Sequence, residues 1–134
     1  MAAAKYDFSI EQGASFRLSI VHKDDQGNPI DMSGYCARLV WKTSSGETTA
    51  FSSENTDYSQ YKFSIDPPNG KITLLIPAHT TNNYTFSNAK YDLEIKTPQD
   101  FYLGGGKYTE RVLFGSVNII KRFSQTTDLL GCST

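Results

Sequence analysis

The sequence has few of the residues on which metal sites and most catalytic centres depend. Its 134 residues include two histidines and two cysteines, and neither His22 nor His79 has a second His or Cys at a metal-ligand spacing. The Gly-x-Ser-x-Gly motif of many hydrolases is also absent. We therefore expect no catalytic residues, no metal site and no cofactor, and we interpret Cys36 and Cys132 as free thiols.

Charge and long apolar runs are also scarce. Charged residues make up 20% of the chain, and the formal net charge is -1. Such a chain lacks the overall positive charge that non-specific nucleic-acid binding requires. No apolar run is long enough to span a bilayer, and the start of the chain lacks the features of a signal peptide. We expect synthesis in a cytoplasm, with neither nucleic acid nor membrane as a partner.

Two short motifs resemble ligand sites only superficially. Asp24, Gln26 and Asn28 supply alternate side-chain oxygens, but the terminal Glu of a calcium loop is missing, so a turn explains them better. The glycines of residues 104–106 are followed neither by a helix start nor by a Lys-Ser/Thr pair, which a phosphate-binding loop would need. We interpret them as the tip of a hairpin.

Aromatic residues are abundant, at 13% of the chain, and apolar residues mostly alternate with polar ones. The clearest case is Tyr91 to Lys96, with apolar odd positions and charged even positions, which predicts a central strand that ends before Pro98. Similar alternation predicts further strands at 16–20, 35–42, 47–51, 61–65, 71–76 and 108–120. We expect 47–51 at a sheet edge, a bulge at Gly115, and one helical turn after Pro77 at the first helical position.

These elements predict an all-β fold. About seven short strands separated by turn signals favour a two-sheet antiparallel immunoglobulin-like sandwich with one short helical turn, and a small barrel is the rival fold. We expect one domain over residues 1–120, with a short N-terminal arm, and a tail over residues 121–134. The predicted core comprises Phe16, Leu18, Ile20, Leu39, Trp41, Ile72, Leu74, Leu93, Ile95, Leu113 and Val117.

Several short motifs also follow one another in a distinctive order. They are Glu11 to Phe16, Asp24 to Gly27, Pro29 to Asp31, Ser33 to Arg38, Gly70 to Leu74, Tyr91 to Ile95 and Arg111 to Val117. This order resembles the immunoglobulin-like module of small virion structural proteins of tailed phages, which also forms the N-terminal domain of siphophage upper baseplate proteins. The likeness covers most of residues 6–120. The chain departs from it at Phe114, where family members often carry an acidic residue, at residues 104–108 and after Lys121.

The resemblance implies a non-enzymatic component of a phage tail, baseplate or neck, located in the virion and in the host cytoplasm during assembly. Its partners would be other virion proteins and further copies of itself. Interface residues are expected where apolar side chains lie outside the predicted core, in an arm, a hairpin tip and a tail. They are Lys5, Tyr6, Phe8, Phe101, Tyr102, Leu103, Tyr108, Phe123, Leu129 and Leu130.

Two other functions fit the same sequence. Aromatic side chains in or near loops could stack on sugar rings, which would make the chain a carbohydrate-binding module for host-surface adhesion. They are Tyr58, Tyr61, Tyr84, Phe86, Phe101, Tyr102 and Tyr108. A capsid decoration protein would show the same composition and the same lack of catalytic motifs. We favour protein–protein contacts, in which Tyr is enriched.

Overall fold

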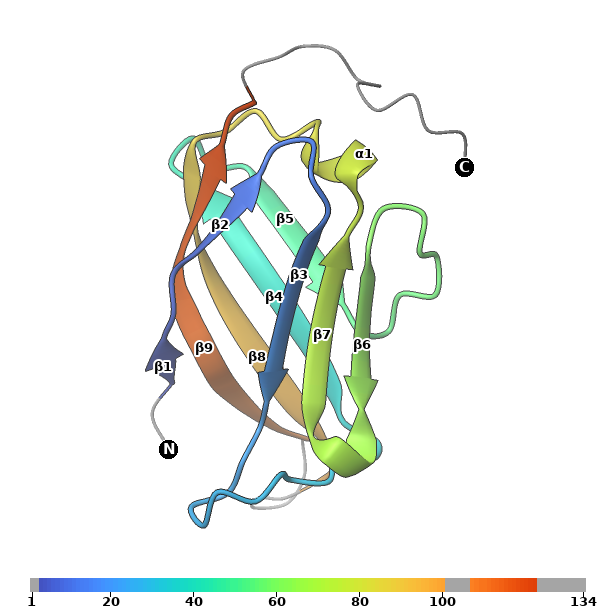
Figure 1. The fold of residues 1–134 in the computed structure, drawn as a ribbon. Helices are drawn as coiled ribbons and strands as arrows, with labels where there is room; N and C mark the ends of the chain where they lie inside the picture. The colour runs from blue at the N-terminus through green and yellow to red at the C-terminus, as the bar shows by residue number, and fades with distance from the viewer. Residues whose placement is uncertain (1–2, 101–106, 123–134) are drawn as a thin grey trace.

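Two β-sheets packed face to face account for most of the chain (Figure 1). The computed structural model describes residues 3–100 and 107–122. Its elements, in chain order, are β1 (Ala4–Lys5), β2 (Phe8–Glu11), β3 (Phe16–Val21), β4 (Cys36–Thr43), β5 (Thr48–Ser52), β6 (Lys62–Asp66), the 3-10 helix η1 (Pro67–Asn69), β7 (Lys71–Ile76), α1 (Ala78–Thr81), β8 (Asn88–Asp100) and β9 (Lys107–Ile120).

The larger sheet, sheet A, has β8 at its centre, as the alternation of Tyr91 to Lys96 predicted. Its order is β1-β9-β8-β4-β5, and β2 also pairs with β9. The turn at Gly46, which has a positive φ of 95°, joins β4 to the edge strand β5. Sheet B has the order β3-β7-β6, with antiparallel pairing throughout. The prediction of an all-β fold with two sheets is confirmed.

The N-terminal segment belongs to sheet A and is not a separate arm. Both β1 and β2 pair in parallel with β9, from Ala4 opposite Leu113 to Glu11 opposite Ile120. Phe8 and Ile10 point into the core while Ser9 and Glu11 remain exposed. The sequence prediction was wrong here because a four-residue alternation is a weak local signal, and its partner strand lies about a hundred residues away in the sequence.

The core lies between the sheets and includes every residue predicted for it. Most of these are buried, whereas Phe16, Ile20 and Leu113 are partly buried and pack against the rest. Trp41, on β4, is 1% exposed and its ring contacts those of Phe51, Tyr84 and Phe86. Buried residues that the sequence did not single out are Phe8, Ile10, Met32, Ala37, Phe51, Phe63, Ile76, Ala89, Tyr91 and Ile119.

Three local predictions need correction. β8 continues through Pro98 to Asp100. Its pairing with β4 ends at Lys96, opposite Cys36, so Pro98 lies beyond the part of β8 that bonds to β4. The missing N–H of Pro98 therefore removes no hydrogen bond to β4. The irregularities in the pairing of β9 with β8 lie between Arg111 and Leu113 and between Lys107 and Thr109, and not at Gly115. Pro77 is the N-cap of α1, with extended backbone angles, and α1 begins at Ala78.

Candidate functional site: the outer face of sheet A

The predicted interface residues fall into three groups. Lys5 and Tyr6 are exposed, but Phe8 is only 7% exposed and packs against the rings of Phe16 and Tyr91. The prediction that Phe8 lies in an interface is thus corrected, because that side chain is part of the core. Tyr108 lies on β9, where the structure describes its backbone alone. The other predicted residues, Phe101, Tyr102, Leu103, Phe123, Leu129 and Leu130, lie outside the described residues.

Specific contacts attach the N-terminal segment to β9 and β8. The Asp7 carboxylate accepts a hydrogen bond from the backbone N–H of Ser116 at 2.8 Å, and the buried Tyr91 hydroxyl donates to the Tyr6 carbonyl at 2.5 Å. Gly115 lies directly beneath this segment, and a Cβ there would contact the Tyr6 carbonyl oxygen. Because Gly115 has no Cβ, the backbone of the N-terminal segment can approach β9 closely. Close backbone approach is, besides a bulge, a common reason for a glycine within a strand.

The outer face of sheet A concentrates positive charge that the whole-chain net charge hides. We call this surface the basic face and define it by the described charged side chains of β1, β4, β8 and β9 that the register directs away from the core. They are Lys5, Arg38, Lys42, Lys90, Lys96 and Arg111, with the carboxylates of Asp92 and Glu94. The outward Glu11 of β2, opposite Ile120 at the end of β9, lies outside this definition. Six cations and two carboxylates give this face a formal charge of +4, on a chain whose net charge is -1.

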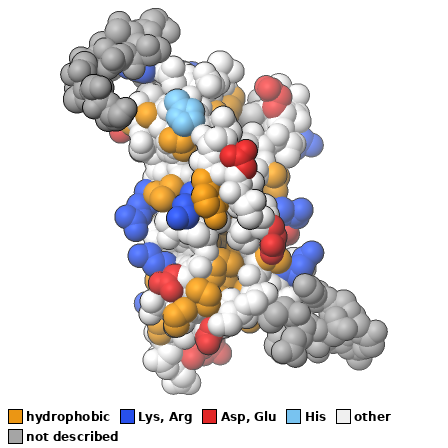
Figure 2. Space-filling view, turned by 90° about the vertical axis from the view of Figure 1, so that its right-hand side faces the viewer, with side chains coloured by type: hydrophobic (Ala, Val, Ile, Leu, Met, Phe, Trp, Pro, Cys, Tyr) orange, Lys and Arg blue, Asp and Glu red, His pale blue; other side chains and the backbone are white. Residues whose placement is uncertain are grey.

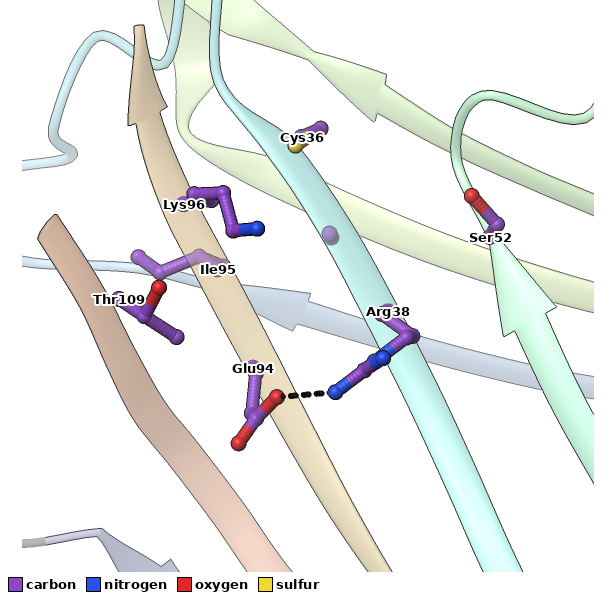
Figure 3. Close-up of a pocket in the computed structure, with 8 residues that line it drawn as sticks. Cys36, Arg38, Ser52, Glu94, Ile95, Lys96 and Thr109 are labelled. Atoms are coloured by element: carbon purple, nitrogen blue, oxygen red, sulfur yellow. Dashed lines mark hydrogen bonds and ion pairs between the residues drawn. The ribbon is translucent and has the colours of Figure 1, made fainter. Parts of the chain in front are cut away.

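Both carboxylates of the basic face are paired with arginines. Arg38 Nη2 lies 2.9 Å from Glu94 Oε1 across the β4–β8 pair, as Figure 3 shows, and Arg111 Nη1 lies 3.1 Å from Asp92 Oδ1. These pairs are largely exposed, so each adds little to stability. Within the described residues, none of the four lysines of this face is within ion-pair distance of a carboxylate. The positive charge of the lysines is therefore available to a partner.

Two shallow hollows open on the basic face. The first lies over β4, β8, the end of β5 and β9, and its polar lining comes from Cys36, Arg38, Ser52, Glu94, Lys96 and Thr109, which Figure 3 labels. The second, which we call the lysine hollow, is lined at its rim by Lys5, Lys42 and Lys90. Arg111, Asp92 and Phe114 also line it, and the Arg111 guanidinium lies 4.9 Å from the Phe114 ring centroid.

One pair of lysines in the lysine hollow lowers the stability of the fold. Lys42 and Lys90 lie directly opposite each other on β4 and β8, so their side chains share one face of neighbouring strands. Like charges in that position destabilise a sheet. Ser116 continues the row on β9, opposite Lys90. A negatively charged group placed over this row would relieve the repulsion.

The sequence contained a signal for this surface that the composition obscured. The predicted alternation of 35–42 and 91–96 already placed Arg38, Lys42 and Lys96 on outward faces. The alternation does not show which strands are neighbours in the sheet. The positive charge accumulates on one face only because β4, β8, β9 and β1 belong to the same sheet.

Of the described titratable groups with clearly shifted pKa values, Tyr91 alone lines one of the two hollows. Hydrogen bonds from Ser33 and Ser59 lower the pKa of Asp31 and Asp57, respectively, in exposed turns. Burial raises the pKa of Tyr84 to about 12. Burial, followed by the nearby Tyr6, Asp7 and Asp92, raises the pKa of Tyr91. These shifts follow from capping turns and core packing.

The described residues contain neither a cluster of metal-binding side chains nor a membrane-spanning helix. No group of three or more His, Cys, Asp or Glu side chains is placed to hold a metal ion. Asp24, considered above for calcium, instead accepts hydrogen bonds from the backbone N–H groups of Gln26 and Asn28 within its own turn. No helix in this part of the chain is long and apolar enough to cross a membrane.

Comparison of the chain with models of protein families and with curated protein sequences found no match. The function is therefore inferred from the residues, the fold and the surface.

Proposed function

We propose that this chain is a non-enzymatic structural protein of a tailed-phage virion, with an immunoglobulin-like fold. It would serve in the tail, baseplate or neck and associate with other virion proteins after synthesis in the host cytoplasm. The motif order given above suggests the phage assignment, and the strand order of the two sheets supports the fold assignment.

The strand order is the observation that carries this proposal. In immunoglobulin variable-type domains one sheet contains strands G, F, C and C′, and the other contains B, E and D. If β3 is taken as strand B and the following strands are lettered in turn, sheet A contains G-F-C-C′ and sheet B is B-E-D. The segment β1–β2 then takes the position of strand A, and the buried Trp41 lies on strand C, as in that fold.

The basic face favours binding over catalysis. Its carboxylates are paired with arginines, and its lysines extend from a broad surface that is open to solvent. Such a surface can select a partner by charge and shape without a reaction centre.

Carbohydrate binding receives less support from the described aromatic residues. Tyr61, Tyr84 and Phe86 pack against the core, so they do not offer free ring faces for stacking on sugars. Tyr58 remains about half exposed. Protein contacts are therefore the preferred function.

Cryo-electron microscopy of purified virions from the phage that encodes the chain would test the proposal. We expect density that fits the two-sheet sandwich, in many copies, in the tail, baseplate or neck. Density only on the capsid surface would instead identify a decoration protein. Absence of the chain from purified particles, checked by mass spectrometry of the same preparation, would refute a virion role.

A further inference from the structure

Part of the negative charge of the described chain lies in segments that connect the strands. One such segment is residues 53–61, between β5 and β6, which we call the acidic loop. It contains Glu54 and Asp57 and has no Lys or Arg. Figure 2, which views the molecule from the side of β6, shows Asp and Glu side chains interspersed with Lys and Arg on this side of the molecule. The acidic loop is therefore a local segment that carries carboxylates and no cation of its own.

The acidic loop is ordered by its own hydrogen bonds. The Asn55 side chain donates to the Asp57 carbonyl at 2.8 Å, and the Asp57 carboxylate accepts from the Ser59 backbone N–H at 3.1 Å. The hydrogen bonds from Ser59 lower the pKa of Asp57 further below neutral pH, where the carboxylate is already ionised. A loop that is already ordered loses little conformational entropy when it binds.

The acidic loop also presents an aromatic side chain of the kind found at the centre of protein interfaces. Tyr58 is 53% exposed, and Lys62 Nζ lies 5.3 Å from its ring centroid. Tyrosine is enriched in interfaces because it contributes a large contact area and loses little side-chain freedom. The acidic loop thus combines two carboxylates with an exposed ring.

We propose that the acidic loop of one copy of this chain binds in the lysine hollow of a second copy. This inference deepens the proposed function, because it names the surfaces that join neighbouring copies in the assembly. The carboxylates of Glu54 and Asp57 would neutralise the opposed Lys42 and Lys90. The partly buried Phe114, which lines the same hollow beside the Arg111 guanidinium, would provide apolar contact for the incoming Tyr58.

The geometry of the contact determines the kind of assembly. The lysine hollow lies on the outer face of sheet A towards β1 and β9, whereas the acidic loop lies beside β6 at the opposite side of the molecule (Figure 1). Because the two surfaces lie on opposite sides, one pair of copies cannot form both contacts at once. The contact is therefore head-to-tail and builds rings or open arrays.

A nucleic acid fits these surfaces less well than a second copy. The basic face has a formal charge of +4 within a chain of net charge -1. A long polyanion crossing the outer face of sheet A would also pass the exposed carboxylate of Glu11 on β2. A small acidic loop can occupy the hollow without this repulsion.

Sedimentation of the full chain across a concentration series tests the contact. Between about 50 mM and 500 mM NaCl we expect the association constant to fall at least about tenfold, since salt screens charge pairs at an interface. The double variant Lys42→Glu/Lys90→Glu should weaken association by at least about tenfold at low salt, and so should Glu54→Lys/Asp57→Asn. Asn at position 57 keeps a side-chain oxygen for the Ser59 N–H.

Mixing the two double variants provides the decisive measurement. The first keeps an acidic loop and the second keeps a basic hollow, so an equimolar mixture should associate although neither variant does alone. The matched control is Arg17→Glu/Lys71→Glu, which changes the net charge by the same amount on the outer face of sheet B. It should associate like the unmodified chain.

Three results would overturn the inference. A chain that remains monomeric at low salt would do so, as would undiminished association of the Lys42→Glu/Lys90→Glu variant. The third is tight binding of random-sequence duplex DNA by the unmodified chain that this variant loses, which would assign the hollow to nucleic acid. None of these results removes the chain from the virion, so particle microscopy tests the proposed function separately.

Discussion

Gly115 shows how a single residue connects the N-terminal segment to the rest of sheet A. A Cβ at this position would meet the Tyr6 carbonyl oxygen and would lie 2.7 Å from the Asp7 carboxylate. Since the first of these atoms belongs to the backbone, it cannot move without disturbing the pairing of β1 and β2 with β9. Gly115→Ala should therefore lower the free energy of unfolding by about 1–3 kcal/mol, measured by urea denaturation.

The control for Gly115→Ala is Ser116→Ala at the next position. The hydrogen bond to Asp7 uses the backbone N–H of Ser116, which alanine retains. We expect a change within about 0.5 kcal/mol. Equal stability of the two variants would show that the N-terminal segment does not pack closely over Gly115.

Tyr84 gives a prediction for alkaline pH. Its ring packs edge-on to Trp41, and burial raises its pKa from 10.0 to about 12. Between these values the unfolded chain loses the phenolic proton while the folded chain keeps it. The free energy of unfolding should therefore fall as the pH rises through this window. Urea denaturation at a series of pH values measures the slope, which should be shallower in Tyr84→Phe.

Lysines also titrate in this window, so the comparison between Tyr84→Phe and the unmodified chain is the informative one. Tyr91, whose pKa is raised in the same direction, should give a second reduction in slope when Tyr91→Phe is added. The free energy of unfolding at pH 8, where both phenols are protonated, is measured for each protein and subtracted. This removes the effect of the hydrogen bond from Tyr91 to the Tyr6 carbonyl that Tyr91→Phe loses. Identical slopes in all three proteins would mean that neither phenol is protected in the folded state.

At the scale of elements, the sequence predicted strands with strong local patterns and missed those that depend on distant partners. The central strand β8, the turn at Gly46 and the edge strand β5 follow from alternation and turn residues within a few positions. The pairing of β2 with β9 does not, because a parallel neighbour leaves no turn in the sequence to reveal it. The basic face was missed for the same reason, since it forms only when several strands lie side by side.

Strand β2 offers a direct test that the N-terminal segment is part of the fold. Ile10 is fully buried whereas its neighbour Ser9 is exposed. Ile10→Ala removes buried methyl groups and leaves a cavity, so it should lower the free energy of unfolding by about 2–5 kcal/mol in urea denaturation. Ser9→Ala should change it by no more than about 0.5 kcal/mol. Similar small effects at both positions would indicate an arm that is detached in solution.

At the scale of the whole molecule, charge is arranged so that composition alone is misleading. A net charge of -1 indicates a chain without strong electrostatic preferences. The fold gathers cations on the basic face and places part of the carboxylates in segments such as the acidic loop. The net charge determines the electrostatic potential far from the molecule. Contact between neighbouring copies depends instead on the charges of the surfaces that meet.

The last two described residues, Lys121 and Arg122, make hydrogen bonds to the folded domain. Lys121 Nζ donates to the carbonyls of Thr85 and Phe86 at 2.6 and 3.1 Å, and Arg122 Nη1 donates to the Asn82 side chain at 3.0 Å. These contacts extend the domain two residues beyond the boundary predicted at residue 120. A truncation that tests the tail should therefore be made after Arg122.

A chain truncated after Arg122 should unfold in urea within about 0.5 kcal/mol of the full chain, because all contacts described here remain. A chain truncated after Ile120 is the control and should be less stable, since it loses the Lys121 and Arg122 hydrogen bonds. If the tail supplies the interface expected for Phe123, Leu129 and Leu130, the chain ending at Arg122 should fold normally but be depleted from virions. Mass spectrometry of purified particles measures that depletion, and normal occupancy would restrict the interface to the folded domain.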